Sequence, residues 1–412
     1  MKRVVITGMG VVSPIGNSIK DFWDSLINGK CGIDKIKGFD NFDLPVRLAA
    51  QVKDFNPEEY GLTRTEIRRS DLYCKYALVA ASQAIEQSGL VSGTSIDSER
   101  YGVYIGSCIG GLDTFIAQTE VLINEGARRI SPLFIPMMIS NMAGGNVAIK
   151  YNANGPCLTT VSACSTGANA VGEAYRAIKF GYADAIVAGG SEAAVHPLTI
   201  GGFANCKALS FSDDPLRASI PFDKERAGFV LAEGAGIVVL EEYEHAKARG
   251  AEILAELSGY GVTCDAFHCT APSPEGKQAA RAIKMALEES DYDGTTEMYI
   301  NAHGTGTHLN DKSETGAIKQ ALGDEFAKKV SVSSTKSMTG HMLGAAGAVE
   351  VIASTLALKN GIVPPTNGLK VPDPLCDLDY TPVNAKKREI SIAISNSLGF
   401  GGHNVCLAMK KI

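Results

Sequence analysis

Short apolar runs alternate with longer segments of helical periodicity along most of this chain, and that alternation is typical of an α/β fold. The short runs are rich in valine and isoleucine and predict buried strands. The longer segments carry apolar residues at helical spacing, and several end at a glycine, which predicts helices. In the first half we expect strands at 3–8, 101–107, 158–162 and 184–190, a pair of strands over 228–241, and helices at 19–29, 71–89, 112–125, 135–151 and 168–180.

The second half of the chain repeats the order of the first. A short strand followed by a helix of small residues is expected over 330–360, and it repeats the pattern of 158–180. The stretch 402–409 echoes 234–241 in the same way. These repeats predict a duplicated α/β fold, with ligands gathered at strand ends between the two halves. The two halves are expected at 1–251 and 252–412.

Gly8 and Gly10 follow the first expected strand and predict a glycine-rich turn. The spacing resembles the start of a dinucleotide-binding loop. That alternative is disfavoured because Ser13 stands at the third glycine of the motif, and Pro14 follows where the helix should begin.

Composition narrows the class of protein further. The chain has 412 residues, so we expect two subdomains around separate cores. Its net charge of −6 argues against nucleic-acid binding through a general positive field. No apolar run approaches the roughly 20 residues of a membrane helix, so no membrane span is expected. The ten cysteines are scattered without a Cys-x-x-Cys pair, which favours reduced thiols and a cytoplasmic location.

Cys164 lies where the strand expected at 158–162 meets the small-residue helix at 168–180. The free N–H groups and the dipole at a helix N-terminus favour an anion, so they favour a thiolate there. A buried structural cysteine is the alternative for any free thiol. The sharp strand-to-helix corner is typical of a nucleophile elbow, and we therefore predict that Cys164 is a nucleophile.

Two histidines follow strands of the second half. His303 lies in a loop rich in glycine and threonine after the strand expected at 298–302. His341 closes a motif that takes, in the second half, the place of the cysteine turn. A structural role is the alternative for either histidine. Zinc is not expected, because His303 and His308 do not share one helical face and no second cysteine lies near.

A thiol and two imidazoles suit one reaction in particular. The thiolate would accept an acyl group as a thioester, and the two imidazoles would bond to a thioester carbonyl as it becomes an enolate. Decarboxylation would then generate a carbanion without a strong base. A protease triad would instead need one histidine and an orienting asparagine or aspartate.

Five motifs carry a resemblance that covers essentially the whole chain. They are Val-Ser-Ala-Cys-Ser-Thr-Gly from Val161, Pro-Phe-Asp-Lys-Glu-Arg-Ala-Gly-Phe-Val from Pro221, Asn-Ala-His-Gly-Thr-Gly-Thr from Asn301, Lys-Ser-Met-Thr-Gly-His from Lys336 and Asn-Ser-Leu-Gly-Phe-Gly-Gly-His-Asn from Asn396. In this order and spacing the chain resembles the β-ketoacyl-acyl carrier protein synthases, the condensing enzymes of fatty acid synthesis, and among them the elongating type II. The resemblance implies a thiolase-like fold, a duplicated αβαβα core of five layers, and a homodimer.

The same resemblance implies the reaction of an acyltransferase. An acyl group would pass from acyl carrier protein to Cys164. Malonyl-acyl carrier protein would then lose CO2 and condense with it to give 3-oxoacyl-acyl carrier protein. No resident cofactor is implied, because the substrates carry their own phosphopantetheine.

Other members of the same fold remain alternatives. A discrete polyketide-type ketosynthase is the strongest, because His-Gly-Thr-Gly-Thr also occurs there. A thiolase would carry a second cysteine in Cys-x-Gly where this chain has Gly401, Gly402 and His403. A type III initiating synthase would pair its cysteine with one histidine and an asparagine. A chain-length-factor subunit would lack the cysteine.

Site residues follow from the resemblance, position by position. Cys164 would be acylated, while His303 and His341 would bind the malonyl thioester carbonyl. The N–H groups of Cys164 and Phe400 would form an oxyanion hole, with the Phe400 ring as a gate. The remaining expected residues are Lys336 for electrostatic support, Thr270, Thr305 and Thr307 for phosphopantetheine, Ile109 and Phe203 for the acyl tunnel, Asn301, Glu350 and Asn396 for a monovalent cation, and Arg68, Arg69 and Lys207 for docking of the carrier.

Overall fold

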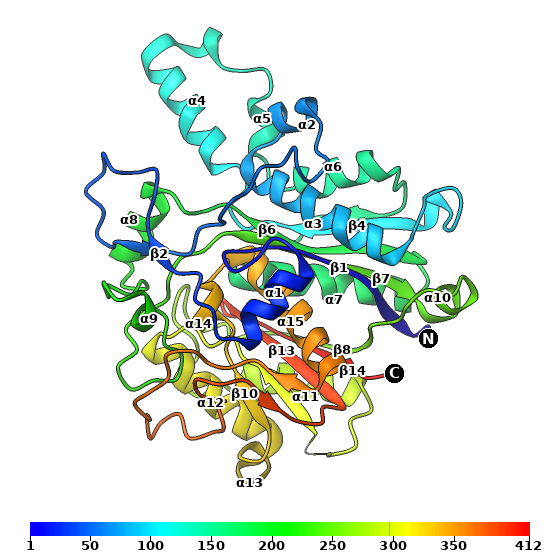
Figure 1. Ribbon diagram of the computed structural model, residues 1–412, viewed down its shortest axis with the longest axis vertical. Coiled ribbons are helices and arrows are strands. Elements are labelled where there is room, and N and C mark those ends of the chain that lie inside the picture. Colours follow the sequence, from blue (N-terminus) through cyan, green and yellow to red (C-terminus); the bar gives the residue numbers. More distant parts are fainter. Residues whose placement is uncertain (296) are drawn as a thin grey trace.

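The computed structural model describes residues 1–295 and 297–412. Its main sheet has ten strands in the order β10-β9-β13-β14-β8-β1-β7-β6-β4-β5 (Figure 1). Their bounds are β1 (Val4–Val12), β4 (Tyr101–Gly106), β5 (Cys157–Leu158), β6 (Ala185–Glu192), β7 (Gly234–Glu242), β8 (Ala255–Cys264), β9 (Met298–Asn301), β10 (Ser331–Ser333), β13 (Ile392–Gly399) and β14 (His403–Lys410). Two small sheets pair β2 (Asp34–Lys35) with β3 (Leu48–Ala49) and β11 (Ile362–Val363) with β12 (Lys386–Lys387).

The helices fall between these strands. They are α1 (Ile19–Ile27), α2 (Arg64–Arg68), α3 (Leu72–Ser88), α4 (Leu112–Glu125), α5 (Phe134–Met138), α6 (Met142–Tyr151), α7 (Thr166–Lys179), α8 (Pro197–Asn205), α9 (Pro215–Ala218), α10 (Tyr243–Ala248), α11 (Lys277–Glu289), α12 (His308–Leu322), α13 (Asp324–Ala327), α14 (Lys336–Thr339) and α15 (Ala346–Asn360). Within the described ranges, none of them is both long enough and apolar enough to cross a bilayer.

The main sheet consists of two halves with the same internal plan. From the centre outward, one half runs β1-β7-β6-β4-β5 and the other runs β8-β14-β13-β9-β10. In each half the first two pairings are antiparallel and the last two are parallel. The halves meet where β1 pairs antiparallel with β8, through Val4–Ile6 and Ala255–Leu257. The duplication expected from the sequence is therefore present in the strand order, and the division at 251/252 stays a prediction.

Helices cover both faces of each half-sheet. α3 and α6 pack on the outer face of the first half, and α11 packs on the outer face of the second, with α12 beside it. α7 and α15 lie between the two halves and contact strands of both (Figure 1). The resulting order is helix, sheet, helix, sheet, helix. This confirms the five-layer α/β fold.

The two central helices are buried along most of their length, and α7 keeps one partly exposed polar side with Glu173, Arg176 and Lys179. Every residue from Ala346 to Leu358 of α15 is buried, and α7 is buried along most of its length. Their small residues allow backbones to approach closely. A Cβ on Gly167 would lie 2.8 Å from the carbonyl oxygen of Gly344, and one on Gly347 would lie 2.7 Å from the Cβ of Ala168. The Ala and Gly content read from the sequence therefore serves packing within the middle layer.

The turn expected at Gly8 and Gly10 is wrong. Strand β1 continues through both glycines to Val12. A Cβ at Gly8 would lie 2.0 Å from the carbonyl oxygen of Ala84, and one at Gly10 would lie 1.9 Å from that of Ala80. These glycines let α3 lie directly on the strand. The second half has the same close approach: a Cβ added at Gly259 or Gly261 of β8 would lie 2.0 Å from the carbonyl oxygen of Ala286 or 1.9 Å from that of Ala282, both in α11.

Three other expected elements differ from the structure. The strand expected at 158–162 is limited to β5, and Leu158 is exposed because β5 is the outermost strand of its half. The helix expected at 135–151 is broken into α5 and α6, and at the break the carbonyl oxygen of Ile139 accepts a hydrogen bond from the Tyr73 hydroxyl. The pair of strands expected over 228–241 is one strand, β7, in the described chain. Residues 396–404, whose motif is named above, form a hairpin of β13 and β14 with a short tip, because Gly399 pairs with His403.

Candidate active site

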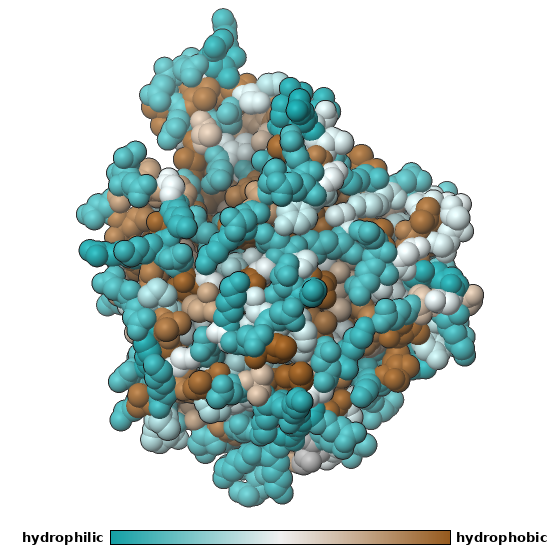
Figure 2. Space-filling view, in the orientation of Figure 1, coloured by the Kyte–Doolittle hydropathy of each residue, from teal (hydrophilic) through white to brown (hydrophobic). Residues whose placement is uncertain are grey.

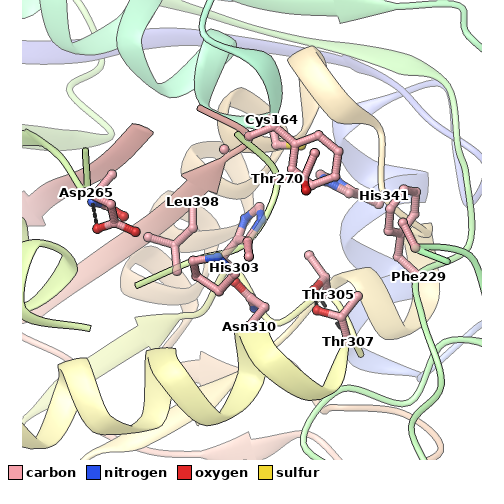
Figure 3. Close-up of a pocket in the computed structure, with 16 residues that line it drawn as sticks. Cys164, Phe229, Asp265, Thr270, His303, Thr305, Thr307, Asn310, His341 and Leu398 are labelled. Atoms are coloured by element: carbon pink, nitrogen blue, oxygen red, sulfur yellow. Dashed lines mark hydrogen bonds between the residues drawn. The ribbon is translucent and has the colours of Figure 1, made fainter. Parts of the chain in front are cut away.

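A cavity of about 80 Å³ lies at strand ends between the two halves (Figure 3). Its lining comes from the cysteine turn, Ala208 and Phe229 of the first half and from four segments of the second half: 265–272, 303–310, His341 and 398–404. Seven of the residues predicted from the sequence line it: Cys164, Thr270, His303, Thr305, His341, Thr307 and Phe400. The sequence therefore identified residues that the fold brings to one place from positions far apart in the chain.

Cys164 lies in a tight 3₁₀ turn, Ala163–Ser165, that leads directly into α7. Ala163 adopts φ +50°, a left-handed conformation that costs free energy in a residue with a side chain. The corner expected from the sequence is thus present. The acidic thiol expected there is wrong, because burial raises the pKa of Cys164 to about 11. The positive charge of Lys336 and the N–H groups of Phe400 and Cys164 act in the other direction without overcoming burial.

The second half contains a matching turn at Leu343–Ala345, which leads into α15. Leu343 has φ +45°, as Ala163 has φ +50°. If the two turns are aligned so that Leu343 corresponds to Ala163, then Gly344 is the residue that corresponds to Cys164. His341 therefore precedes the equivalent position by three residues, and the expectation that its motif takes the place of the cysteine turn is corrected accordingly.

His303 leaves the end of β9 in a loop fixed by Glu314 of α12. The two carboxylate oxygens of Glu314 accept the N–H groups of His303 and Gly304 at 2.7 and 2.8 Å. The ring of His303 stands edge to face with that of His341, with centroids 5.3 Å apart. Burial, with the charge of Lys336, holds the pKa of both imidazoles well below its usual range, so both are neutral at pH 7.

Lys336 lies behind His303 and does not line the cavity. Its Nζ pairs with a carboxylate oxygen of Glu350 and lies 3.4 Å from Nδ1 of His303. An ammonium group has donors and no acceptor, so Nδ1 of His303 must be the acceptor. The neutral ring then carries its proton on Nε2. Lys336 thereby fixes the tautomer in which His303 has a donor left for a ligand.

Phe400 is at the tip of the β13–β14 hairpin. The tip is tied to the loop that carries Thr270, because Gly401 N–H donates to the carbonyl oxygen of Cys269 at 2.8 Å. Asn404, at the base of the tip, donates from Nδ2 to Asp265 at 2.8 Å. The N–H group of Phe400 faces the Cys164 thiol and lowers its pKa. The hairpin tip and the loop that carries Thr270 are therefore held together, and they place the N–H group of Phe400 beside the Cys164 sulfur and Thr270 in the cavity lining.

Family-model matches cover both halves of the chain. Residues 1–246 match the beta-ketoacyl synthase N-terminal domain, and residues 254–370 match the beta-ketoacyl synthase C-terminal domain. The chain belongs to the β-ketoacyl synthase family. This confirms the resemblance drawn from the five motifs.

Relatives of this β-ketoacyl synthase match along its whole length. The chain is 51% identical over 411 residues to 3-oxoacyl-[acyl-carrier-protein] synthase 2 of Synechocystis, with 100% of this chain and 98% of that protein covered. The enzyme of the same name from Vibrio harveyi is 48% identical over 412 residues, covering 100% and 99%.

Solved structures also superpose over the full chain. A beta-ketoacyl synthase from Burkholderia phymatum has a TM-score of 0.93 at 34% identity, with 100% of both chains covered. A type II PKS acyl-carrier protein in complex with its ketosynthase gives a TM-score of 0.90 at 36% identity, again with both chains fully covered.

The tunnel residues predicted for the β-ketoacyl synthase lie beside the cavity and do not line it. Ile109 and Phe203 pack with Cys164 against one apolar cluster. The ring of Phe203 lies 5.5 Å from that of Phe229 and 6.3 Å from that of Phe400, centroid to centroid. Apolar surface therefore continues from the thiol toward Ile109.

Thr305 and Thr307 line one wall of the cavity, with their hydroxyl oxygens 3.1 Å apart. Thr270 lies in the loop that faces them, where its backbone N–H donates to Nδ1 of His268 at 3.1 Å. Three hydroxyl groups are thus available to a polar ligand that enters beside Cys164.

The three residues predicted to hold a cation are buried behind the histidines. Each has a side-chain oxygen without a hydrogen-bond partner among the described residues: Oδ1 of Asn301, Oε2 of Glu350 and Oδ1 of Asn396. The hydroxyl groups of Ser395 and Ser397 are unpartnered in the same sense. Unsatisfied buried oxygens are costly, and hard cations bind oxygen ligands, so these residues fit a monovalent cation.

The predicted docking residues Arg68, Arg69 and Lys207 are exposed. They come from the end of α2 and from the residues after α8. No ion pair engages any of the three within the ranges that the structure describes, so their charges face solvent.

Sequence reasoning missed the residues that fix the His303 loop. Fully buried Asp311 accepts the N–H groups of Phe222 and Gly306 at 2.8 and 3.2 Å. Arg226 is buried too and donates to the carbonyl oxygens of Thr307 and His308 at 3.4 and 3.2 Å. One signal was available for Asp311 and Glu314, because a spacing of three places both on one face of the helix that follows the histidine. Arg226 lies in the motif that begins at Pro221, but no spacing within that motif indicated that its side chain would hold the His303 loop.

Proposed function

We propose that this chain catalyses the elongating condensation of fatty acid synthesis. An acyl group passes from acyl carrier protein to Cys164, and malonyl-acyl carrier protein then condenses with it to give 3-oxoacyl-acyl carrier protein and CO2. Full-length relatives at 48–51% identity carry the name 3-oxoacyl-[acyl-carrier-protein] synthase 2 and support this reaction. The observation that carries the proposal is one buried cavity with a thiol, two neutral imidazoles and an amide donor beside the sulfur.

In the first step the sulfur of Cys164 attacks the thioester carbonyl carbon of the carrier. The carrier sulfur leaves and takes up the proton that the thiol loses, so the step is balanced without water. The N–H groups of Phe400 and Cys164 face this position and support the oxyanion that forms during the attack. Because the thiol has a pKa of about 11, it waits as a neutral group until a substrate arrives.

In the second step a malonyl thioester loses CO2. The electron pair of the broken C–C bond moves onto the thioester oxygen as an enolate. Nε2–H of His303 donates to that oxygen, and His341 supports it from the adjacent ring. Neutral imidazoles give no proton away outright, so the enolate carbon remains free to attack the carbonyl carbon of the acyl group on Cys164. As the new C–C bond forms, the bond from that carbon to the Cys164 sulfur breaks, and the sulfur leaves with the electron pair and takes up a proton from solvent. A cation held by Asn301, Glu350 and Asn396 would supply a fixed positive charge behind His303.

The free carrier is acidic, and the chain has a net charge of −6, so a local basic patch must offset repulsion. We assign that docking role to Arg68, Arg69 and Lys207, which are exposed. The solved complex of a ketosynthase with an acyl-carrier protein, at 36% identity, supports a partner of this kind. The cytoplasmic location rests on the scattered free cysteines.

We also propose a homodimer. β5 is an edge strand, and Leu158 and Val161 beside it are exposed apolar residues. α4 projects from the body of the chain, with apolar side chains among its hydrophilic ones (Figures 1 and 2). Exposed edges and apolar patches of this kind are typically covered in solution. Sedimentation analysis of the wild type and of Leu158→Asp tests the dimer: the wild type should be a dimer and the variant a monomer.

A polyketide-type ketosynthase is the less supported alternative. The ketosynthase of the type II PKS complex is 36% identical, lower than the 51% of the 3-oxoacyl-[acyl-carrier-protein] synthase 2 of Synechocystis. Incubation with a ladder of acyl carriers and malonyl carrier, followed by product mass, separates the two. Each saturated acyl group should gain one two-carbon unit, and one malonyl carrier should lose CO2 for each product formed. Activity confined to poly-β-keto carriers would overturn the proposal.

A further inference from the structure

Glu192 is a fully buried carboxylate that the proposed reaction does not use. Oε1 accepts the hydroxyl of Ser107 at 2.8 Å and the N–H of Ile109 at 3.1 Å. Oε2 accepts the N–H of Cys108 at 2.9 Å, its thiol at 2.7 Å and the N–H of Gly344 at 3.1 Å. Three backbone amides, a hydroxyl and a thiol therefore surround one carboxylate, and each donor points at an oxygen. Such a cradle is an anion-binding site.

The position of this cradle follows from the duplication of the fold. Glu192 ends β6 as Gly399 ends β13, and both strands have eight residues and the same place in their half-sheets. Gly399 lies against the cysteine turn, where an added Cβ would be 3.3 Å from the nitrogen of Cys164. Glu192 lies in the same way against the nitrogen of Gly344, which is the residue equivalent to Cys164.

The two turns therefore use their amides differently. At the first turn, the N–H groups of Cys164 and Phe400 face the thiol and stay available to a reacting oxygen. At the second turn, the N–H of Gly344 is already bonded to Glu192. A Cβ on Gly344 would lie 2.5 Å from Oε2 of Glu192, so only glycine lets the carboxylate approach so closely.

Glu192 also connects segments on two sides of the reacting thiol. One segment is 107–109, where Ile109 packs with Cys164 against the same apolar cluster. The other is the turn that follows His341 by two residues and begins at Leu343, whose φ of +45° is strained. A buried acceptor shared by both segments removes their freedom to move relative to each other.

We infer that Glu192 is a positioning residue: its carboxylate permanently fills the anion hole of the second turn and so fixes the loop that carries Ile109 relative to Cys164. Its effect on acyl transfer rests on the proposed function. The anion hole is supported by the set of hydrogen bonds to Glu192 alone. An experiment can therefore refute the proposed function without refuting the anion hole, and the reverse.

Chemical rescue tests the inference. Glu192→Ala removes the carboxylate and leaves its donors without a partner. Acylation of Cys164 from a long-chain acyl carrier, followed by protein mass, should slow on the order of tenfold or more, since one orphaned buried donor has about that effect on an equilibrium. Sodium formate should restore most of the rate and raise the melting temperature, because formate has the size and charge of the missing group. Formamide at the same concentration should do neither.

A matched control is Glu233→Ala. Glu233 is another buried carboxylate, which accepts the N–H of Val52 and the hydroxyl of Tyr76, each at 3.1 Å, and does not line the cavity. Formate should not change its acylation rate. Equal responses of both variants to formate and formamide, or no response of Glu192→Ala to formate, would overturn the anion hole.

Glu192→Gln covers the case in which the alanine variant does not fold. The amide is isosteric but must present an NH2 group to donors, so acylation should again be slow, and formate should have no effect because the site is occupied. Acylation at the wild-type rate by this variant would refute the positioning role. If the wild type itself takes up no acyl group, the proposed function fails, and the formate-dependent melting temperature still decides the anion hole.

Discussion

The rings of His303 and His341 stand edge to face at 85°, with centroids 5.3 Å apart, although 38 positions separate the residues in the chain. Both neutral rings line one cavity that also contains Cys164. In the proposed reaction, a carbonyl oxygen in this cavity accepts from both rings. The relationship explains why two histidines are needed where a hydrolase would need one.

Replacement of either histidine should separate the two halves of the reaction. In His303→Ala or His341→Ala, one donor to the enolate is lost, and CO2 release from malonyl carrier should fall by roughly 10²–10³. Acylation of Cys164 from an acyl carrier should remain partly intact. Radiolabelled CO2 release and protein mass measure the two steps. Decarboxylation at the normal rate in both variants would refute the assignment.

The raised pKa of Cys164 predicts an unusual pH profile for its alkylation. The thiolate is the reactive form, and with a pKa of about 11 its fraction rises about tenfold per pH unit from pH 7 to pH 10. Iodoacetamide labelling, followed by peptide mass, should therefore accelerate throughout that range. Glutathione, with an ordinary thiol, serves as the control and should level off above its pKa of about 8.5. A plateau for Cys164 below pH 9 would contradict the prediction.

Cys164→Ser or Cys164→Ala should abolish acyl transfer while leaving the fold intact. The side chain is small, and the strain of the turn lies at Ala163 rather than at Cys164. Uptake of an acyl group, measured as protein mass, should be lost. An acylated Cys164→Ala protein would show that another group is the nucleophile.

Lys336→Ala should damage both stability and decarboxylation. It leaves Glu350 buried without its ion-pair partner, and breaking a buried pair typically costs about 3–5 kcal/mol. It also removes the donor to Nδ1 of His303, so the useful tautomer is no longer enforced. Lys359→Ala is the matched control, because Lys359 and Glu252 form an exposed pair that should contribute less than about 1 kcal/mol. Urea unfolding and CO2 release measure the effects, and equal stability losses in the two variants would contradict this account.

Charge reversal at Arg68 and Arg69 should weaken recognition of the carrier. Both side chains are exposed, so their attraction acts through solvent and is screened beyond about 8 Å at physiological ionic strength. The Michaelis constant for carrier-bound substrate should rise, and less so in high salt, because association slows. Turnover of a small pantetheine thioester should stay nearly unchanged. Equal losses on both substrates would show damage to the fold or the site instead.

Gly10→Ala should destabilise the protein although the change is one methyl group. The new Cβ would lie 1.9 Å from the carbonyl oxygen of Ala80, so α3 must shift, at a cost of roughly 1–3 kcal/mol. Gly201→Ala in α8 is the control, since nothing lies within 4 Å of a Cβ there. Thermal unfolding of both variants decides between close packing and a flexible turn at Gly10.

Motifs identified the candidate site from the sequence better than periodicity identified the elements. Many of the residues that line the cavity come from the cysteine turn, the 303–310 loop, the motif that ends at His341 and the 398–404 tip, and each of these stretches has a polar, glycine-containing signature in the sequence. The segment 265–272, which also lines the cavity, has no glycine and no such signature. The turn predicted at Gly8 and Gly10 was wrong because the sequence does not distinguish a glycine that allows a helix to pack closely on a strand from a glycine that allows the chain to turn. Only the distance to Ala84 and Ala80 distinguishes the two uses.

Electrostatics could not be predicted locally either. The helix N-terminus beside Cys164 suggested a thiolate, yet burial outweighs it and raises the pKa. Burial here depends on packing with Ile109, Phe203 and other residues far away in the chain. Glu192 was missed for the same reason, because its five donors come from segments that become neighbours only in the folded chain.

The middle layer has a consequence for how this chain folds. α15 is buried from Ala346 to Leu358, and α7 is buried except along one side that carries Glu173, Arg176 and Lys179, so most of the surface of both helices is covered by the two half-sheets. A half that folded alone would leave one apolar side of its central helix uncovered. We therefore expect the two halves to become stable only when they dock together around these helices. Despite its length, the chain should lose its structure in one cooperative transition, with no separately stable half along the way.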